Sequence, residues 1–561
     1  MTPLDETFPR ALDALLSGAT TLWLFEDGAT RAAAERSAAE AGRAVRIRSA
    51  YKTLLHDVLE DGVLDGARRA VIRYPVLPGV AADRFRLECY PLHALVPDCE
   101  IAFVPDPQDG PGLPVYTVET EDARHSVPVP VRRRAGADGR TVLGACGWAA
   151  RGDEGMPLET EYEAIFERAC AAMRALPPDP AAPDGPFFPR LDVEVTLPVA
   201  DMVLPVGHER ISLAEAMHEE IYFAGLEIFR QRLGLPPGER SVRCGQIVPR
   251  VVIGDVPRLQ MRLNAPEIEP PAPACPEPPD LGTVSHWLSP AEIAGHLDRI
   301  GGVPFAGRSR QGRAIPGRFV KGTGRAALAI SGGQHANEST GIVGALRAAR
   351  DLAAEGRASF TVTPLENPDG YAVFRALCRD RPHDMHHAAR YTASGADLGH
   401  ARDCPERNVR DRARAHLSAE VHLNLHGYPS HEWTRPLSGY IPEGFAGWTV
   451  PKGFFLILRH APEAAALGRL VLDAALDALA ACPEIAAQNR RMLSLYDRYV
   501  SERAFRVHAG CVPYVTGVEE GADYPVTLIT EAPDETVDGA AFRLAQAAHA
   551  RVVSAVAAVI G

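Results

Sequence analysis

The sequence predicts an α/β fold, in which a mixed, mainly parallel sheet lies between helices in residues 283–561. Short apolar runs at 326–333, 358–364, 419–425 and 525–530 are typical of buried strands. Helix-like segments at 341–355 and 540–560 intervene or follow. Because alternating strands and helices favour parallel strands covered on both faces, we expect a sheet with helices on each side.

The length of the chain predicts more than one domain, since 561 residues are too many for a single hydrophobic core. A proline-rich stretch at 265–282 predicts a stiff, extended linker, and a weaker break falls at 176–189. We therefore divide the chain into an N-terminal region (1–178), a small α+β region (179–268) and a C-terminal domain (283–561).

The N-terminal region predicts a small α/β unit followed by β-rich material. Strand-like runs at 20–25, 44–49 and 70–75 accompany a helix-like run at 30–42, and the β-rich part extends from about 84 to 148.

The second region contains one long helical pattern, which begins with a capping-box signature at Ser212 and Glu215. Its His-Glu-Glu at 218–220 resembles half of a metal motif, but we expect a solvated helix surface there. Residues 1–268 receive no chemical role. Capping a cleft, restricting substrates and mediating oligomerisation all stay open.

Composition and charge exclude several classes of partner. With 59 basic and 72 acidic residues the net charge is −13, which argues against nucleic acid as the main partner. No apolar stretch approaches the ~18 residues of a membrane span, and the start of the chain lacks a signal-peptide pattern, so we expect no membrane partner. Ten scattered cysteines without a CxxC favour a reduced, cytoplasmic setting. The oligomeric state stays open.

Polar side chains follow each of the four apolar runs in the C-terminal domain. The first run leads to His335 and Glu338, the second to "LENPDGY" at 365–371, the third to His426 and the fourth to Glu531. Because ligands bind outside the carboxyl ends of parallel strands, these motifs are expected to converge on one site.

The residue types at these strand ends fit a catalytic zinc site. Catalytic zinc takes three protein ligands from His and Glu or Asp and keeps a fourth position for water. His335, Glu338 and His426 supply three such ligands, and Glu531 could act as the general base. Any one motif alone is typical of a turn, but the four in this order favour one Zn²⁺ per chain.

These motifs resemble those of the zinc metallocarboxypeptidases of the carboxypeptidase A type, over residues 283–561, about half the chain. "GGQHANES" resembles that family's first zinc motif, and "NPDGY" its characteristic loop. "VHLNLHGYP" is similar to the strand carrying the second zinc histidine, which implies His426 rather than His422 as the ligand. "TLITEAPDE" is similar to the strand ending in the general-base glutamate, which implies Glu531.

The resemblance implies further site residues. Asp397, in "GADL", would orient the first zinc histidine. Arg390 would polarise the scissile carbonyl and stabilise the oxyanion, with Arg379 and Arg381 as further candidates. Tyr514, in "YVTG", would be a substrate-binding tyrosine.

One departure from the family concerns the substrate. Where an Asn-Arg pair would hold a terminal carboxylate, this chain has Gly399 and His400. Either another arginine takes over, with Arg402, Arg407 and Arg410 close in sequence, or the substrate lacks a free carboxylate there. His400 and Arg402 are our predicted substrate-binding residues.

The predicted function is a zinc-dependent hydrolase of peptide or amide bonds, similar to a metallocarboxypeptidase. One alternative is an amidase or deacylase of the same fold, acting on a small metabolite or on a modified peptide without a standard C-terminus. Another is a catalytically degenerate binding or scaffold protein. We expect the histidine cluster at 382–387 to be a surface or substrate-lining loop rather than a second metal site, and "HEW" at 431–433 could line the pocket.

Overall fold

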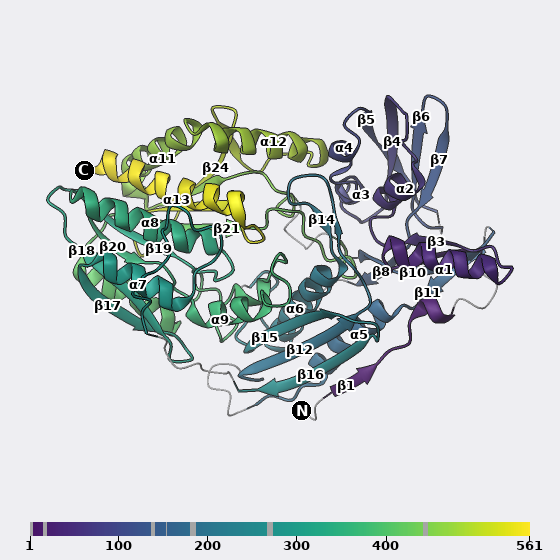
Figure 1. Ribbon diagram of the computed structural model, residues 1–561, viewed down its shortest axis with the longest axis horizontal. Coiled ribbons are helices and arrows are strands. Elements are labelled where there is room, and N and C mark those ends of the chain that lie inside the picture. Colours follow the sequence, from purple (N-terminus) through teal and green to yellow (C-terminus); the bar gives the residue numbers. More distant parts are fainter. Residues whose placement is uncertain are drawn as a thin grey trace.

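The computed structural model describes residues 4–14, 20–110, 112–135, 141–152, 154–179, 187–239, 241–265, 273–440 and 447–561. Parts of the two proline-rich stretches, 180–186 and 266–272, lie outside the described residues. The C-terminal domain occupies one end of the molecule, and the elements of residues 20–110 occupy the other (Figure 1).

A nine-stranded mixed sheet forms the centre of the C-terminal domain, with the order β17-β18-β20-β19-β21-β25-β22-β24-β23. The neighbours β20, β19, β21 and β25 run parallel, whereas β22 pairs antiparallel with β25. The strands are β17 (Val303–Arg308), β18 (Ala314–Val320), β19 (Ala327–Gly332), β20 (Ser359–Thr363), β21 (Val421–Tyr428), β22 (Phe455–His460), β23 (Arg506–His508), β24 (Val512–Val518) and β25 (Val526–Pro533). The predicted mixed α/β architecture is confirmed, with four neighbouring parallel strands at the centre and, toward the edges, antiparallel pairs together with the parallel pair β22–β24.

The four predicted strands correspond to β19, β20, β21 and β25, and two of them continue beyond their apolar runs. His426 therefore lies inside β21 and Glu531 inside β25. Their Cα atoms are register partners across the two parallel strands. The sheet itself thus places these two side chains next to each other.

Helices cover one face of this sheet. α8 (Ser339–Glu355) packs against β19 and β21, and α11 (Ala465–Ala480) packs against β22 and β25. α13 (Gly539–Ile560) lies between these two helices and contacts β19 and β25 (Figure 1). A Cβ atom on Gly341 would lie 2.4 Å from the carbonyl oxygen of Leu425. Only glycine allows this approach, which brings the start of α8, and Glu338 with it, against β21.

The opposite face is covered only in part. α10 (Asn408–His416) packs against β17, β18 and β20, while the face over β21, β25 and β22 carries a cavity. The other helices of this domain are α7 (Pro290–Ile300), α9 (Pro368–Leu377) and α12 (Pro483–Tyr499). In the described part of the chain, helices on both faces, as the alternation predicts, are found at the end of the sheet formed by β17, β18 and β20.

The described residues of the N-terminal half form three smaller sheets, the first of which joins early and late strands. One has the order β11-β10-β2-β3, the second β5-β4-β6-β7, and the third pairs β8 with β9. Their bounds are β2 (Thr21–Leu24), β3 (Arg46–Ser49), β4 (Arg69–Val76), β5 (Glu100–Pro107), β6 (Val115–Thr120), β7 (Arg124–Pro128), β8 (Val131–Ala135), β9 (Thr141–Ala145), β10 (Gly147–Arg151) and β11 (Glu154–Leu158). The helices α1 (Gly28–Glu40), α2 (Thr53–Asp61), α3 (Arg84–Glu88) and α4 (Leu92–Leu95) accompany them. The predicted strands are present, and the β-rich part follows the first unit in sequence, with β6 pairing with β4 and β10 with β2.

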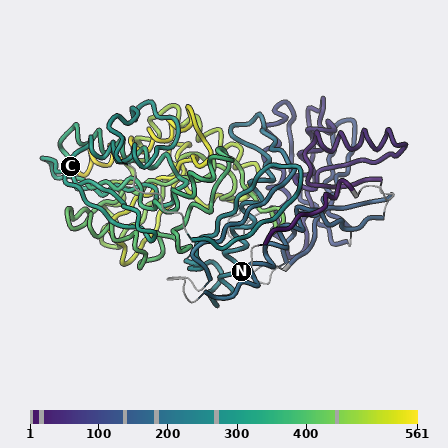
Figure 2. The backbone as a smooth tube through the Cα atoms, turned by 60° about the horizontal axis from the view of Figure 1, so that its bottom comes forward, coloured from purple at the N-terminus to yellow at the C-terminus, as the bar shows by residue number. Residues whose placement is uncertain are grey.

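A fourth sheet, β1-β16-β12-β15, lies between the N-terminal elements and the C-terminal domain (Figures 1 and 2). Its strands are β1 (Leu4–Thr7), β12 (Arg190–Leu197), β15 (Gln246–Ile253) and β16 (Arg258–Asn264), and a two-stranded pair, β13 (Met202–Val203) and β14 (Arg210–Ile211), lies nearby in sequence. β1 comes from the first predicted region, and α5 (Glu161–Ala175), also from that region, packs on α6 (Leu213–Arg232). The boundary predicted near residue 178 therefore runs through one packed unit.

Ser212 caps the start of helix α6, and its side chain accepts a hydrogen bond from the backbone N–H of Glu215. The helix packs against β15 and α5 on one side and against the C-terminal domain on the other. His218, Glu219 and Glu220 are consequently buried. The expectation of a solvated helix surface here is wrong, because segments distant in sequence cover the polar side of the helix.

Among the described residues, no helix combines the length and the apolar character needed to cross a membrane.

Candidate metal centre

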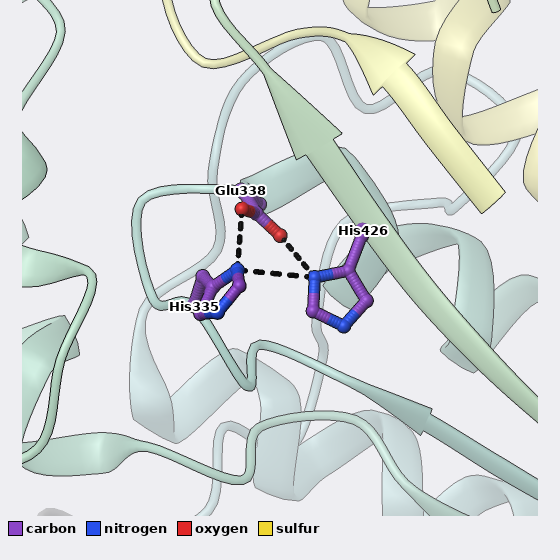
Figure 3. Close-up of side chains that lie close together, drawn as sticks. All are labelled: His335, Glu338 and His426. Carbon is purple, nitrogen blue, oxygen red and sulfur yellow. Dashed lines mark hydrogen bonds and ion pairs between the residues drawn. The ribbon is translucent and has the colours of Figure 1, made fainter. Parts of the chain in front are cut away.

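Three buried side chains meet at the end of β19 and β21. His335 and Glu338 lie on the turn from β19 into α8, and His426 lies in β21. His335 Nδ1 is 2.7 Å from Glu338 Oε1, His426 Nδ1 is 2.7 Å from Glu338 Oε2, and the two Nδ1 atoms are 3.1 Å apart (Figure 3). One ligand atom from each residue thus faces a common point.

This donor set fits a metal ion. The three ligand atoms lie within 4.8 Å of one another, and within the described ranges no other group of three His, Cys, Asp or Glu residues offers such a set. Glu338 Oε2 is buried and makes no well-aligned hydrogen bond, although it approaches His426 Nδ1 closely. Ligand atoms that face one metal ion converge as these three atoms do. Two imidazoles with one carboxylate are typical zinc ligands.

The electrostatics keep the carboxylate of this group ionised. Burial alone would raise the pKa of Glu338, but the imidazoles of His335 and His426 outweigh it and lower that pKa far below its usual value. Burial and Arg390 both disfavour a charged His335, yet Glu338 and Asp397 raise its pKa overall. A cation in this position is therefore favoured by the side chains around it.

Glu531 lies beside the metal group and has the properties of a base near neutrality. It lines the cavity, and burial, with a smaller contribution from Glu338, raises its pKa to about 8. His426, Arg390 and Lys452 act in the opposite direction.

The raised pKa of Glu531 makes a prediction for the metal-free chain. An unfolded carboxyl loses its proton near 4.5 and the folded one only near 8, so the free energy of unfolding should fall as pH rises through this interval. Glu531→Gln should reduce that fall. Urea unfolding at pH 5 and pH 8 with chelator present measures it, and equal pH dependence in both proteins would contradict the assigned environment.

The buried amine of Lys452 lies near Glu531 and was not predicted from the sequence. Its buried Nζ lies 4.4 Å from the ring centroid of Trp448, 4.7 Å from that of Tyr428 and 5.1 Å from that of Phe455. In the described part of the chain Nζ has no hydrogen-bond partner. Burial lowers the pKa of Lys452 to about 7, and Glu531 opposes this shift. No sequence pattern around Lys452 indicates that its amine is buried against aromatic rings near Glu531.

Arg390 is the one of the three candidate arginines that the structure brings to the metal group. Its Nη1 lies 3.2 Å from Glu338 Oε1 and 3.9 Å from Glu535 Oε1. Arg379 is exposed, and Arg381 pairs with Asp384 and with Asp201, away from the cavity.

The "NPDGY" segment holds the backbone at Arg390. Asn367 caps α9 by accepting from the N–H of Gly370, and its side-chain amide donates to the carbonyls of Arg390 (3.3 Å) and Tyr391 (3.1 Å). Asp369 ties the same turn to the loop between β17 and β18 by accepting from Ser309 Oγ (2.7 Å). The segment is therefore a structural support for the arginine.

Asp397 lies behind His335, where an orienting carboxylate is predicted. Its Oδ1 is 3.5 Å from His335 Nε2, and its Oδ2 is 3.2 Å from His400 Nδ1. Burial opposes its ionisation, but these two histidines hold the pKa of Asp397 well below its usual value.

We expect Asp397→Asn to weaken zinc binding about 10–100-fold, because the carboxylate fixes the orientation and basicity of the ligand imidazole. Competition with a chromophoric chelator measures the affinity. The exposed Asp411 on α10 offers a matched control in Asp411→Asn, which should bind zinc as the wild type does. Unchanged affinity in Asp397→Asn would remove this residue from the site.

A cavity of about 630 Å³ opens beside the metal group on the uncovered face of the sheet. Side chains of the sheet form its floor, and basic residues line much of its wall. The lining residues include Gln334, His335, Arg390, Asp397, Gly399, His400, Arg402, Arg407, Arg410, His422, Asn424, His426, Ile457, Arg459, Asp523, Tyr524, Thr527, Ile529 and Glu531.

The cavity arginines differ in how far they are already paired. Arg407 pairs with Asp523, and Arg410 forms a two-bond pair with Glu366. Arg402 donates to the carbonyl of Gly521 (2.8 Å). The guanidinium of Arg459, on β22, has no ion-pair or hydrogen-bond partner in the described ranges, and this residue was not predicted from the sequence. The available signal was its position two residues after Ile457, because residues i and i+2 of a strand lie on the same face.

The structure does not bring Tyr514 to this cavity. Tyr514 lies in β24 in register with Leu456 and packs against the hydrophobic core. Its part in substrate binding stays a prediction.

Neither histidine-rich segment lines the cavity. In the 382–387 cluster, the residues from Asp384 to His387 are buried, and His387 contacts Glu219 of α6. His431 lies 2.8 Å from Glu215 of the same helix. The expectation of a surface or substrate-lining loop is wrong for 384–387, because α6 covers it. In "HEW", His431 and Trp433 contact α6, whereas Glu432 pairs with Lys52.

No family model matches this chain, and no curated protein matches it. Solved structures match about half of it. A metallo-carboxypeptidase from Burkholderia cenocepacia is 16% identical, with 48% of this chain and 69% of that chain covered and a TM-score of 0.31. A metallo-carboxypeptidase from Pseudomonas aeruginosa is 15% identical, with 48% of this chain and 69% of that chain covered and a TM-score of 0.30. The carboxypeptidase A from Helicoverpa armigera is 13% identical, with 55% of this chain and 90% of that chain covered and a TM-score of 0.31.

Proposed function

We propose that the chain is a zinc-dependent hydrolase of peptide or amide bonds, similar to a metallocarboxypeptidase. The observation that carries this proposal is the convergence of three buried ligand atoms next to Glu531, a carboxyl with a raised pKa, at the edge of a cavity. A metal site with a neighbouring base is the minimum set for hydrolysis by activated water.

The roles of the residues follow from their positions. His335 Nδ1, Glu338 and His426 Nδ1 would hold the ion, and Asp397 would orient His335. Bound zinc supplies a Lewis acid that activates water and polarises a carbonyl. Glu531 takes a proton from the attacking water on a carboxylate oxygen and passes it to the leaving amine. Arg390 donates to the carbonyl oxygen as negative charge develops on it.

The cavity favours a substrate with an anionic group. Among the described lining residues, Arg459 and Arg402 have no carboxylate partner. The exposed His400 shares Asp397 with His335. Recruiting Arg407 or Arg410 would break pairs with Asp523 and Glu366. A peptide carboxylate held by Arg459, His400 or Arg402 is therefore our leading substrate feature.

An amidase or deacylase of the same fold is the second candidate. Gly399 has no side chain to bind a terminal carboxylate, and an imidazole at His400 cannot reproduce a guanidinium fork. A degenerate scaffold protein is less well supported, because all three ligands and the base are present and adjacent.

Mass spectrometry of a mixed peptide library, incubated with and without chelator, tests the proposal. Chelator-sensitive loss of single C-terminal residues would support a carboxypeptidase. Cleavage only of blocked peptides or N-acyl amides would support the amidase. No cleavage of either class by zinc-loaded protein would contradict both.

A further inference from the structure

Helix α6 belongs to the N-terminal half, yet three of its buried carboxylates hold segments of the C-terminal domain. Glu215 accepts from the N–H of Met385 (3.0 Å) and contacts His431. Glu219 Oε2 is 2.6 Å from His387 Nδ1. Glu220 accepts from the N–H groups of Leu437 (2.5 Å) and Ser438 (2.8 Å).

The contact at His387 leads directly to the metal group. His387 begins the 3₁₀ turn His387–Ala389, and Arg390 caps that turn by donating its N–H to the carbonyl of His387 (2.9 Å). The Arg390 guanidinium then reaches Glu338. One short turn therefore connects a carboxylate of the N-terminal half with the arginine beside the metal ligands.

The imidazole of His387 is fixed on more than one side. Its ring centroid lies 5.1 Å from that of Phe223, on α6, and 4.9 Å from that of Trp433. These two aromatic rings stack on each other at 5.8 Å. Packing sets the ring plane, and Glu219 sets which way Nδ1 points.

The electrostatics favour a neutral hydrogen bond between the two residues. Burial raises the pKa of Glu219 well above its usual value, with Glu215 adding to the shift. Burial, together with Arg390, lowers the pKa of His387 well below its usual value. A neutral pair holds the turn without cancelling the positive charge of Arg390.

We infer that Glu219 is a positioning residue for Arg390: it holds His387, and His387 begins the turn that ends at Arg390. The N-terminal half is thereby part of the active-site structure. This inference rests on the proposed function, in which Arg390 stabilises the oxyanion. Such stabilisation depends on placement, since a displacement of about 1 Å can cost roughly 10²-fold in rate.

Two substitutions in the full-length, zinc-loaded chain test the inference. Glu219→Ala should lower kcat about 10–100-fold while KM and zinc content stay within about twofold, because Arg390 acts on the transition state. Glu219→Gln keeps a hydrogen bond to His387 and should retain most of the activity. If Glu219→Ala does not fold, His387→Asn replaces it, with the same expected loss.

Glu227→Gln is the matched control. Glu227 lies on the same helix but pairs with Arg435 instead of the turn at His387, so its kcat should equal that of the wild type. An equal loss in this control would assign the effect to general damage to α6 and overturn the inference.

A double mutant separates positioning from structural damage. If Glu219 acts through Arg390, Glu219→Ala should cause no further loss of kcat in an Arg390→Ala background. Additive losses would overturn the inference.

Hydrogen–deuterium exchange gives a readout that does not need activity. The peptide covering 385–392 should exchange faster in Glu219→Ala and not in Glu227→Gln, since the turn is released. Unchanged exchange would overturn the inference even if the enzyme is active. Should the wild type cleave nothing, the proposed function fails, and this exchange experiment alone decides whether Glu219 positions Arg390.

Discussion

Glu531→Gln should abolish turnover and leave zinc bound. Glutamine has nearly the same shape but cannot accept a proton, and general-base catalysis contributes about 10²–10⁴-fold to the rate. Glu531 is not among the three converging ligands, so its loss removes no metal ligand. We expect kcat to fall at least 10²-fold with KM and metal content unchanged.

The exposed Glu520 provides a control for this experiment, since Glu520→Gln changes the same chemical group on the turn before β25. It should be fully active. Steady-state kinetics and metal analysis on the same preparations give the kinetic constants and the zinc content per chain. A fully active Glu531→Gln would remove Glu531 as the base, and a variant that lost its zinc would make it a ligand.

His426→Ala should empty the metal site. Of the three ligand atoms that converge, one is lost, and zinc affinity depends on the complete set of deprotonated ligands. We expect zinc to fall from about one to below about 0.1 per chain after dialysis, with hydrolysis at background.

His422 is a matched control on the same strand and the same face, four residues before His426. Its Nε2 lies 2.8 Å from Ser331 Oγ and takes no part in the metal group. His422→Gln should keep its zinc. The opposite result, with zinc lost from His422→Gln and kept by His426→Ala, would exchange the two histidines and contradict the site.

The metal group could be predicted because each of its residues belongs to a short sequence pattern at the end of a strand. His335 and Glu338 follow a strand directly, and His426 and Glu531 stand at the ends of two further apolar runs. Parallel pairing then brings the strand ends together, which depends only on the order of the elements.

Residues whose surroundings come from distant segments could not be predicted in this way. The polar side of α6 has no local signal of burial, because the residues that cover it are more than 160 positions away in sequence. In the N-terminal half, the pairing of β1 with β16 joins residues some 250 apart, which no pattern within either strand indicates.

Returning zinc to the metal-free chain, while peptide hydrolysis is followed, tests the central claim most directly. We predict no hydrolysis without metal, a rise in rate with each increment of zinc, and a plateau at about one equivalent per chain. Undiminished hydrolysis by the metal-free chain, or none by a chain holding one zinc, would contradict the account.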